Sequence, residues 1–206
     1  MIRIHFVDDH LIVAEKPPGL LSVPGRGPDR QDCLVARVRD QFPDALTVHR
    51  LDQATSGLIV LARGPQAHRT LSMAFAGREV AKRYVAVVAG QVQDDEGVVD
   101  LPLITDWPNR PRQMIDHVLG KPSLTRYRVL SRDPATTRVA LEPVTGRSHQ
   151  LRVHMLSLGH PILGDEFYAP PDIAAASPRL LLHAETLTLP HPETGATMSL
   201  HSDAEF

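Results

Sequence analysis

The feature that most constrains the fold is an apolar run that directly follows a polar segment. The run is Gly57-Leu58-Ile59-Val60-Leu61-Ala62, in which every position is apolar. A strand made from it presents apolar side chains on both faces, and such a strand lies buried with other elements packed on both sides of its sheet. The chain is therefore expected to build a sheet around at least one covered strand.

The rest of the chain predicts many strands and few helices. Helical spacing of apolar residues predicts helices over 31–42, 66–75 and 149–158. Alternation and β-branched residues predict strands over 2–6, 11–14, 46–48, 57–62, 83–88, 98–104, 124–130, 138–144, 180–189 and 197–200. Because no regular strand–helix–strand alternation appears, the pattern predicts an α+β fold with a central mixed, mostly antiparallel sheet and flanking helices and loops.

Length and composition set the class of protein. With 206 residues, the chain is long enough for a core of its own, and we expect a single domain over residues 1–206. Cys33 is the only cysteine, so no internal disulfide forms, which fits a reducing compartment. No run approaches the roughly 20 apolar residues of a membrane span, and no signal peptide opens the chain. We expect a cytoplasmic protein without a membrane partner.

The charge is distributed unevenly. The net charge of −2 does not indicate a nucleic-acid binder, but residues 106–132 contain six basic and two acidic residues, a net of +4. Residues 184–206 contain four acidic residues and no lysine or arginine. Such asymmetry permits a basic face on a nearly neutral protein, although charge alone fits an ordinary solvated loop equally well. Residues 106–122 hold three prolines and little periodicity, which predicts a long irregular excursion of a kind that is usually functional or mobile.

The polar segment from His49 to Ser56 is the first candidate site. It places an imidazole, a guanidinium, a carboxylate and two hydroxyls between two apolar strands. A core has no use for such a cluster, because each buried polar group needs a partner, whereas loops held by rigid strands often carry function. The alternative is a structural turn in which Asp52 caps backbone amides together with Thr55 and Ser56. Both interpretations are open from the residues alone.

Two further clusters contain candidate functional residues. In the segment 146–154, Ser148 is predicted to cap the helix 149–158, with Arg147 at the start of that helix offering a two-pronged donor to a carboxylate. His149 and His154 are five residues apart and fall on different faces, so a zinc pair is not expected. Lys82 and Tyr84 share one face of a strand, where the residues alone favour a core aromatic at Tyr84. No metal-binding pattern and no phosphate-binding glycine loop occurs, so neither a metal nor a nucleotide cofactor is expected.

In four ordered blocks, the sequence resembles the RluA family of RNA pseudouridine synthases. The blocks are Lys16-Pro-Pro-Gly-Leu20, His49-Arg-Leu-Asp52-x-x-Thr-Ser-Gly-Leu58, Lys82-Arg-Tyr84, and Gly146-Arg-Ser-His-Gln-Leu-Arg-Val-His154 with the trailing segment 158–165. Ser148 stands where many members have threonine. Residues 106–113 resemble a loop of the short dual-specificity member, which acts on ribosomal RNA and transfer RNA. Because the pattern starts within about ten residues of Met1, no N-terminal S4 domain is expected.

The resemblance implies an isomerase that converts specific uridines of structured RNA, without cofactor, metal or obligatory protein partner. Hairpins of 23S ribosomal RNA and the transfer-RNA anticodon stem-loop are the implied substrates. The uridine must first leave its helix, because a stacked base cannot rotate. Rival classes are a non-catalytic RNA-binding module of the same fold and a hydrolytic glycosylase that releases uracil.

The resemblance also implies roles for individual residues. Asp52 is the implied essential carboxylate, Arg147 its partner in a buried ion pair, and Tyr84 the aromatic side chain against the flipped uracil. Arg50 is implied to occupy the gap that the flipped base leaves, a task that suits a planar cation. The residues expected to bind RNA are Arg50, His49, Lys82, Arg110 and Arg112.

Overall fold

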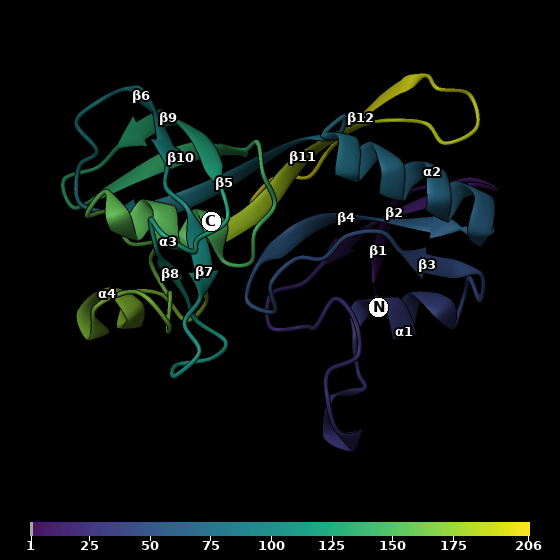
Figure 1. Ribbon diagram of the computed structural model, residues 1–206, viewed down its shortest axis with the longest axis horizontal. Helices are drawn as coiled ribbons and strands as arrows, with labels where there is room; N and C mark the ends of the chain where they lie inside the picture. The colour runs from purple at the N-terminus through teal and green to yellow at the C-terminus, as the bar shows by residue number, and fades with distance from the viewer. Residues whose placement is uncertain (1) are drawn as a thin grey trace. The chain divides into compact units, whose positions relative to one another are not determined.

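The computed structural model describes residues 2–206, and the chain divides into two compact units (Figure 1). The first unit comprises the chain up to Lys82 together with His183–Glu205, and the second comprises Arg83–Leu182 with Phe206. Each unit has its own helices and hydrogen-bonded strands. The expected single domain over residues 1–206 stays a prediction.

The first unit contains a mixed sheet. Its strands follow the order β1 (Arg3–Val7), β2 (Leu11–Lys16), β4 (Ser56–Arg63) and β11 (Leu182–Pro190), with β3 (Ala45–Thr47) paired to β4 and β12 (Thr197–His201) paired to β11. The β1–β2, β2–β4, β3–β4 and β11–β12 pairs are antiparallel, and β11 runs parallel to β4. The predicted mixed, mostly antiparallel arrangement is confirmed.

Strand β4 is the covered strand that the apolar run predicts. Leu58 and Val60 point into a core cluster with α2 (Gly64–Gly77), which contributes Leu71. Ile59 and Leu61 face the other way, because side chains alternate along a strand, and both are fully buried. Figure 1 shows α2 on one side of this sheet and α1 (Leu34–Arg39) on the other.

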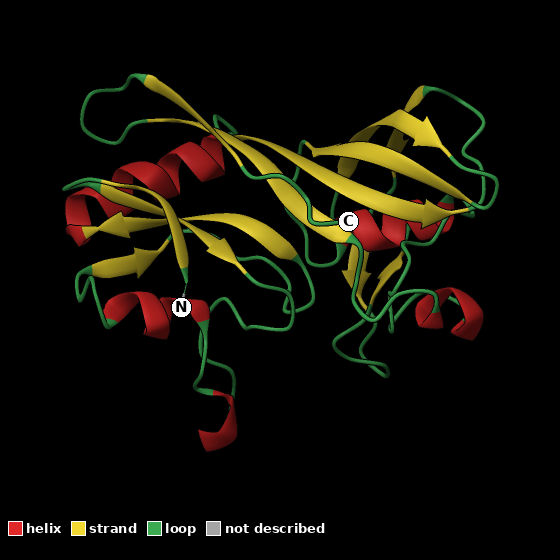
Figure 2. Cartoon of the chain, turned by 180° about the vertical axis from the view of Figure 1, so that it is seen from behind, coloured by secondary structure: helices red, strands yellow, loops and turns green. Residues whose placement is uncertain are grey.

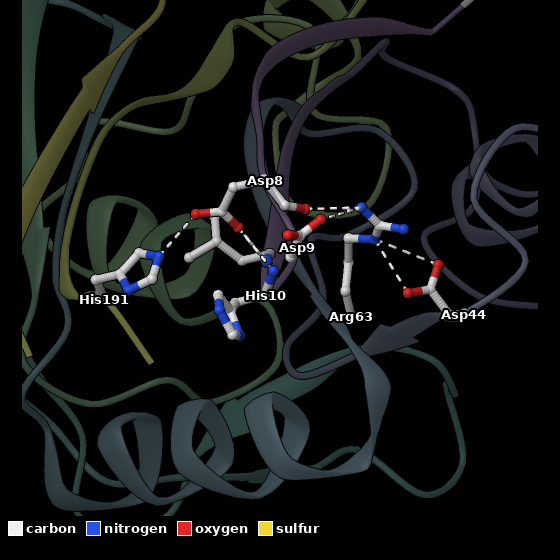
Figure 3. A network of polar contacts seen from close by, with 7 residues as sticks. Asp8, Asp9, His10, Asp44, Arg63 and His191 are labelled. Carbon is white, nitrogen blue, oxygen red and sulfur yellow. Dashed lines mark hydrogen bonds and ion pairs between the residues drawn. The ribbon is translucent and has the colours of Figure 1, made fainter. Parts of the chain in front are cut away.

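A polar network ties the turns of the first unit together (Figure 3). The Asp8 carboxylate in the β1–β2 turn accepts the backbone N–H groups of His10 and Leu11 and lies 2.7 Å from Nε2 of His191, in the β11–β12 turn. Arg63, at the end of β4, donates to the Asp8 carbonyl at 2.8 Å and to the Asp44 carboxylate at 3.0 Å. These contacts hold together the β1–β2 turn, the β11–β12 turn and the end of β4.

The second unit is an antiparallel sheet with a small hairpin. The sheet order is β5 (Ala81–Ala89), β10 (Thr136–Pro143), β9 (Leu124–Arg132) and β6 (Glu96–Asp100); the hairpin pairs β7 (Leu103–Thr105) with β8 (Gln113–Ile115). Helix α3 (Gln150–Ser157) contacts β9 and β10, and α4 (Pro171–Ala175) follows it along the chain (Figure 2). In the described residues, no helix is long and apolar enough to cross a membrane.

Three local predictions are corrected. The strand expected over 98–104 is two strands, β6 and β7, which the segment 101–102 separates because Pro102 has no N–H group for a ladder. The excursion 106–122 is not wholly irregular, since β8 returns along β7. Ser148 is not a helix cap: the N-cap position belongs to His149, which has a left-handed φ of 52° and makes no side-chain cap.

The sequence patterns also did not predict two short helical elements or the position of Cys33. The turn η1 (Pro28–Arg30) and helix α4 have too few residues to show a period, so neither was predicted. Cys33, which lies inside the helix predicted over 31–42, instead precedes α1 and is fully buried.

Gly57 is required where β4 meets β11. Its φ is 109°, and a Cβ atom there would lie 2.3 Å from the Ala184 carbonyl oxygen and 2.5 Å from the Ala184 nitrogen. We expect Gly57→Ala to lower the free energy of unfolding by about 2–4 kcal/mol, because it adds a backbone clash to the left-handed strain. Urea unfolding followed by circular dichroism measures this loss.

The matched control is Gly64→Ala. Gly64 also has a left-handed φ, 75°, but a Cβ atom there would meet nothing within 4 Å. We expect its loss to be about 1 kcal/mol, from backbone strain alone. Equal losses for the two variants would show that the close approach of β4 and β11 does not constrain position 57.

Candidate active site

Asp52 lies in a tight turn that leads into β4. Its carbonyl oxygen accepts the N–H of Thr55 at 3.1 Å, and the residue is half-buried. The turn that the alternative interpretation of residues 49–56 predicted is therefore present. The Ser56 hydroxyl, however, bonds to His183. What distinguishes this turn is that both neighbours of Asp52 are fixed by residues from the start of the chain.

Leu51, which precedes Asp52, is held by a single hydroxyl. The N–H of Leu51 donates to Ser22 Oγ at 3.1 Å, and that hydroxyl donates back to the Leu51 carbonyl oxygen at 2.7 Å. Ser22 and the Leu51 side chain are both buried. In this low-dielectric surrounding the two bonds are stronger than in water, so the peptide groups on both sides of Leu51 have little freedom.

Gln53, which follows Asp52, is held by a buried ammonium group. Lys16 is fully buried, and its Nζ donates to the carbonyl oxygens of Pro17 at 2.9 Å, Leu20 at 2.8 Å and Gln53 at 2.9 Å. Three carbonyls satisfy its three N–H donors, which offsets the cost of burying the charge. Gly19 adds an N–H bond to the Gln53 carbonyl at 2.9 Å and accepts the Gln53 side-chain amide at 2.9 Å.

The start of β4 is tied to β11 through His183. Its Nε2 lies 3.0 Å from the Ser202 carbonyl oxygen, which can only accept, so Nε2 carries a proton. In the neutral ring Nδ1 is then an acceptor, and the Ser56 hydroxyl donates to it at 2.9 Å. All three residues are buried. The turn that carries Asp52 is thus anchored before, after and at the strand that supports it.

His49 is positioned inside the first unit. Its ring stacks on Phe75 with centroids 4.5 Å apart, and its Nε2 accepts the N–H of Val60 at 3.0 Å. Burial, with the nearby Lys82 charge, lowers the pKa of His49 to about 3. The ring is therefore neutral at pH 7 and already bonded. This geometry gives His49 a structural role, and RNA binding by His49 stays a prediction.

The other predicted groups of the first unit differ in exposure. Arg50, two residues before Asp52, is exposed, as a side chain that meets RNA must be. Lys82 is half-buried, with its ammonium 6.0 Å from the centroid of the Phe75 ring, and burial lowers its pKa. Arg50 is the better placed of the two for contact with a phosphate.

In the second unit, the segment around Arg147 is shaped by Gln150. The buried Gln150 side chain accepts the Thr145 hydroxyl at 2.7 Å and the Arg147 N–H at 3.0 Å, and donates to the Leu124 carbonyl at 3.0 Å. Arg147 itself is exposed, with its Nε 3.4 Å from the Pro122 carbonyl. The expectation of a buried Arg147 is wrong, because the residue lies in the exposed segment 146–148 that precedes α3. Its pairing with Asp52 stays a prediction.

The buried guanidinium of this segment belongs to Arg152. It forms a two-pronged ion pair with Asp165, with distances of 2.8 and 2.5 Å, and both residues are almost fully buried. Asp165 also accepts the N–H groups of Phe167 and Tyr168. Paired and hydrogen-bonded in this way, the two charges can stay inside the fold and lock α3 to the segment that follows it.

Tyr84 lies in β5, opposite Leu141 of β10. The residue is half-buried, unlike the neighbouring Val85, which is buried. Tyr84 is therefore not fully buried in the core.

The positive charge of residues 106–132 is more dispersed than its sum suggests. On β9, Arg126 lies opposite Glu142 and Arg128 opposite Glu96, while Arg132 forms an ion pair with Asp95 at 2.8 Å. These arginines face acidic residues from outside the segment. The exposed basic residues of the excursion itself are Arg110, Arg112 and Lys121.

The histidines of the second cluster already have partners. His149 Nδ1 lies 2.6 Å from the Tyr168 hydroxyl, and the buried His154 contacts Thr125 Oγ1 at 2.9 Å and the Leu101 carbonyl at 3.0 Å. Within residues 2–206, no group of three or more histidine, cysteine, aspartate or glutamate side chains is arranged to hold a metal ion.

Comparison with known proteins defines the class of protein. Residues 10–157 match the family model described as RNA pseudouridylate synthase, and the chain belongs to this family. The "Dual-specificity RNA pseudouridine synthase RluA" of Yersinia pestis is 54% identical over 202 residues, covering 98% of both chains. The protein of the same name from Haemophilus influenzae is 53% identical over 206 residues, covering 100% of this chain and 94% of the relative.

Two solved human structures share the fold. "Human RNA Pseudouridylate Synthase Domain Containing 1" matches with a TM-score of 0.83 and 28% identity, covering 98% of this chain and 83% of its own. "Human RNA Pseudouridylate Synthase Domain Containing 4" matches with a TM-score of 0.78 and 27% identity, covering 98% and 88%. The predicted family, fold class and enzyme class are thereby confirmed.

Sequence reasoning missed the residues that hold the site. Lys16, Ser22, Gln150 and Tyr168 support the segments of Asp52 and Arg147 without being candidates themselves. Lys16 had a signal, since it opens the first family block. Ser22, as an ordinary serine in a loop, had none.

The buried His49 makes stability depend on pH. The unfolded chain binds a proton at His49 below about pH 6.5, whereas the folded chain does so only near pH 3. Stability that is fully present above pH 6.5 is therefore lost as the pH falls toward 3, by about 1.4 kcal/mol per unit. We expect His49→Gln, which keeps an acceptor for Val60, to lose about 2 kcal/mol less than wild type between pH 7.5 and 5 in urea unfolding.

The control for this measurement is His201→Gln. His201 is an exposed histidine of the same unit, so its replacement should leave the acid sensitivity of wild type unchanged. If wild type and His49→Gln lose the same stability on acidification, the folded protein does not hold His49 in its neutral form.

Proposed function

We propose that this chain converts uridines of structured RNA to pseudouridine, with Asp52 as the catalytic carboxylate. The observation that carries the proposal is a carboxylate in a turn pinned on both sides, in a chain that matches its family over most of its length. The relatives are named dual-specificity enzymes. Ribosomal-RNA and transfer-RNA hairpins, such as 23S RNA segments and the anticodon stem-loop, are therefore the proposed substrates.

The chemistry needs no co-reactant. The bond from uracil N1 to ribose C1′ breaks, the base rotates, a bond from C5 to C1′ forms, C5 loses its proton and N1 gains one. A carboxylate next to C1′ or the base can act as a nucleophile, a base or a stabiliser of positive charge on the sugar. Because its neighbours in the chain are fixed, Asp52 needs little reorganisation to meet the developing charge.

Tyr84 and Arg147 are proposed as the further catalytic residues. The half-buried Tyr84 offers a ring to the extruded uracil and a hydroxyl to a proton transfer. The exposed Arg147, on a backbone that Gln150 holds, offers a planar donor to a carboxylate or phosphate.

Recognition of RNA is proposed to use exposed cations. Arg50, Arg110 and Arg112 are exposed and can neutralise phosphates, which supplies affinity without sequence choice. Lys82 is a weaker member of this set because it is half-buried. We further propose that the enzyme acts in the cytoplasm without an obligatory protein partner. No observation favours a non-catalytic module.

Replacement of Asp52 by asparagine tests the proposal. We expect Asp52→Asn to lower the single-turnover rate by at least about a thousandfold, since the amide can act neither as base nor as nucleophile. Folding and RNA affinity should be retained. Tritium release from RNA labelled at C5 of uracil, together with mapping of pseudouridine, measures the rate.

The control and the rival outcomes are distinct. Asp40→Asn, at an exposed position after α1, should react like wild type. Turnover near wild type in Asp52→Asn would remove Asp52 from its role. Release of free uracil by wild type would instead identify a hydrolytic glycosylase.

A further inference from the structure

The tip of the β7–β8 hairpin presents an exposed aromatic side chain with a cation over it. Trp107 is 65% exposed, although the guanidinium carbon of Arg110 lies 4.3 Å from the centroid of its ring. The proposed catalytic chemistry uses neither side chain in this way. A large aromatic ring left to solvent costs hydration free energy unless something covers it in the working state.

The hairpin tip, residues 106–112, is closed by its own hydrogen bonds. The N–H of Asp106 donates to the Arg112 carbonyl at 3.0 Å, and the N–H of Arg112 donates to the Asn109 carbonyl at 3.0 Å. The Asn109 side-chain amide also donates to the Asp106 carboxylate at 2.9 Å. Trp107 is thus displayed on an ordered turn, so a ligand that stacks on it has little backbone ordering to offset.

The base of the hairpin is fixed to the segment around Arg147. The N–H of Gln113 donates to the Tyr168 hydroxyl at 2.8 Å. That hydroxyl lies 2.6 Å from Nδ1 of His149, to which it can donate a second hydrogen bond. All of these residues belong to the second unit. One hydroxyl therefore holds the hairpin and the segment of a proposed catalytic residue in a defined arrangement.

We propose that Trp107, with Arg110 behind it, is a stacking platform for an unpaired nucleobase of the RNA substrate, other than the uridine that is isomerised. This rests on the proposed function. Every base offers a flat π-face, and stacking on an aromatic side chain strengthens binding by about ten- to a hundredfold. A cation over the opposite face adds to that attraction. Loops of RNA hairpins supply splayed bases of this kind.

The local charge favours RNA over a protein partner. The tip contains two arginines and one aspartate, and the Asp106 carboxylate is already bonded to Asn109. Arg112 is exposed in the same hairpin tip and can meet the phosphate of the stacked nucleotide. Because Arg110 also lies over the ring, Arg112 is the more available phosphate contact of this pair.

The test uses Trp107 itself, because it is the chain's only tryptophan. Its fluorescence is recorded while a hairpin RNA that the enzyme modifies is added. We expect quenching that saturates with binding and that disappears when one unpaired nucleotide, not the target uridine, is made abasic. Trp107→Phe should keep most of the affinity measured by RNA anisotropy, and Trp107→Leu should lose about tenfold.

Matched variants separate the contributions. Val118→Ala removes an exposed apolar side chain from the turn after β8 and should leave affinity unchanged. Arg112→Ala should lower the slope of log affinity against log salt by about one, while the quenching persists. Val118→Ala should also form pseudouridine at the wild-type rate.

The outcomes distinguish this inference from the proposed function. If wild type forms pseudouridine but its emission does not change at saturating RNA, the platform is wrong and the function stands. If quenching survives every abasic substitution, or Trp107→Leu binds RNA like wild type, the platform is also wrong. If no RNA is converted although quenching is observed, the proposed function fails while the stacking site remains.

Discussion

The buried ammonium group of Lys16 is the contact on which the candidate site depends. It bonds at once to the carbonyls of Pro17 and Leu20 in its own loop and to the carbonyl of Gln53, beside Asp52. A charge buried in this way is stable only while all three carbonyls stay in place, since each lost bond leaves part of the charge unsatisfied. The loop after β2 and the turn before β4 are therefore ordered together.

Both units use the same device: a buried polar side chain orders the backbone beside a side chain that is proposed to be functional. In the first unit, Lys16 and Ser22 fix the residues on either side of Asp52. In the second unit, Gln150 fixes the backbone of Arg147. Side chains that meet RNA must remain accessible, so the proposed catalytic and RNA-binding groups are positioned by buried neighbours. This separation explains why the supporting residues are buried while Arg50 and Arg147 are exposed.

The sequence predicted elements with a clear period and missed features that depend on tertiary contacts. The apolar run 57–62 predicted β4 correctly, because a strand that is covered on both faces needs an apolar side chain at every position. The sequence could not predict that Arg147 is exposed while Arg152 forms a buried pair with Asp165. Both arginines lie near the start of the same helix, and only tertiary contacts determine which of them meets a buried carboxylate. The family blocks indicated Asp52, whereas its anchoring by Ser22 arises only from contact between distant segments.

The most direct test of the central claim, that buried groups hold the Asp52 turn in place, is amide hydrogen exchange in Lys16→Met. The amides of Gly19 and Thr55 should exchange at least about tenfold faster than in wild type, while the β2–β4 ladder stays protected, because the turn then opens locally. Arg39→Met removes another cation that bonds a backbone carbonyl of this unit, that of Ala45, and should leave both amides unchanged. Unaltered exchange of Gly19 and Thr55 in a folded Lys16→Met variant would contradict the account.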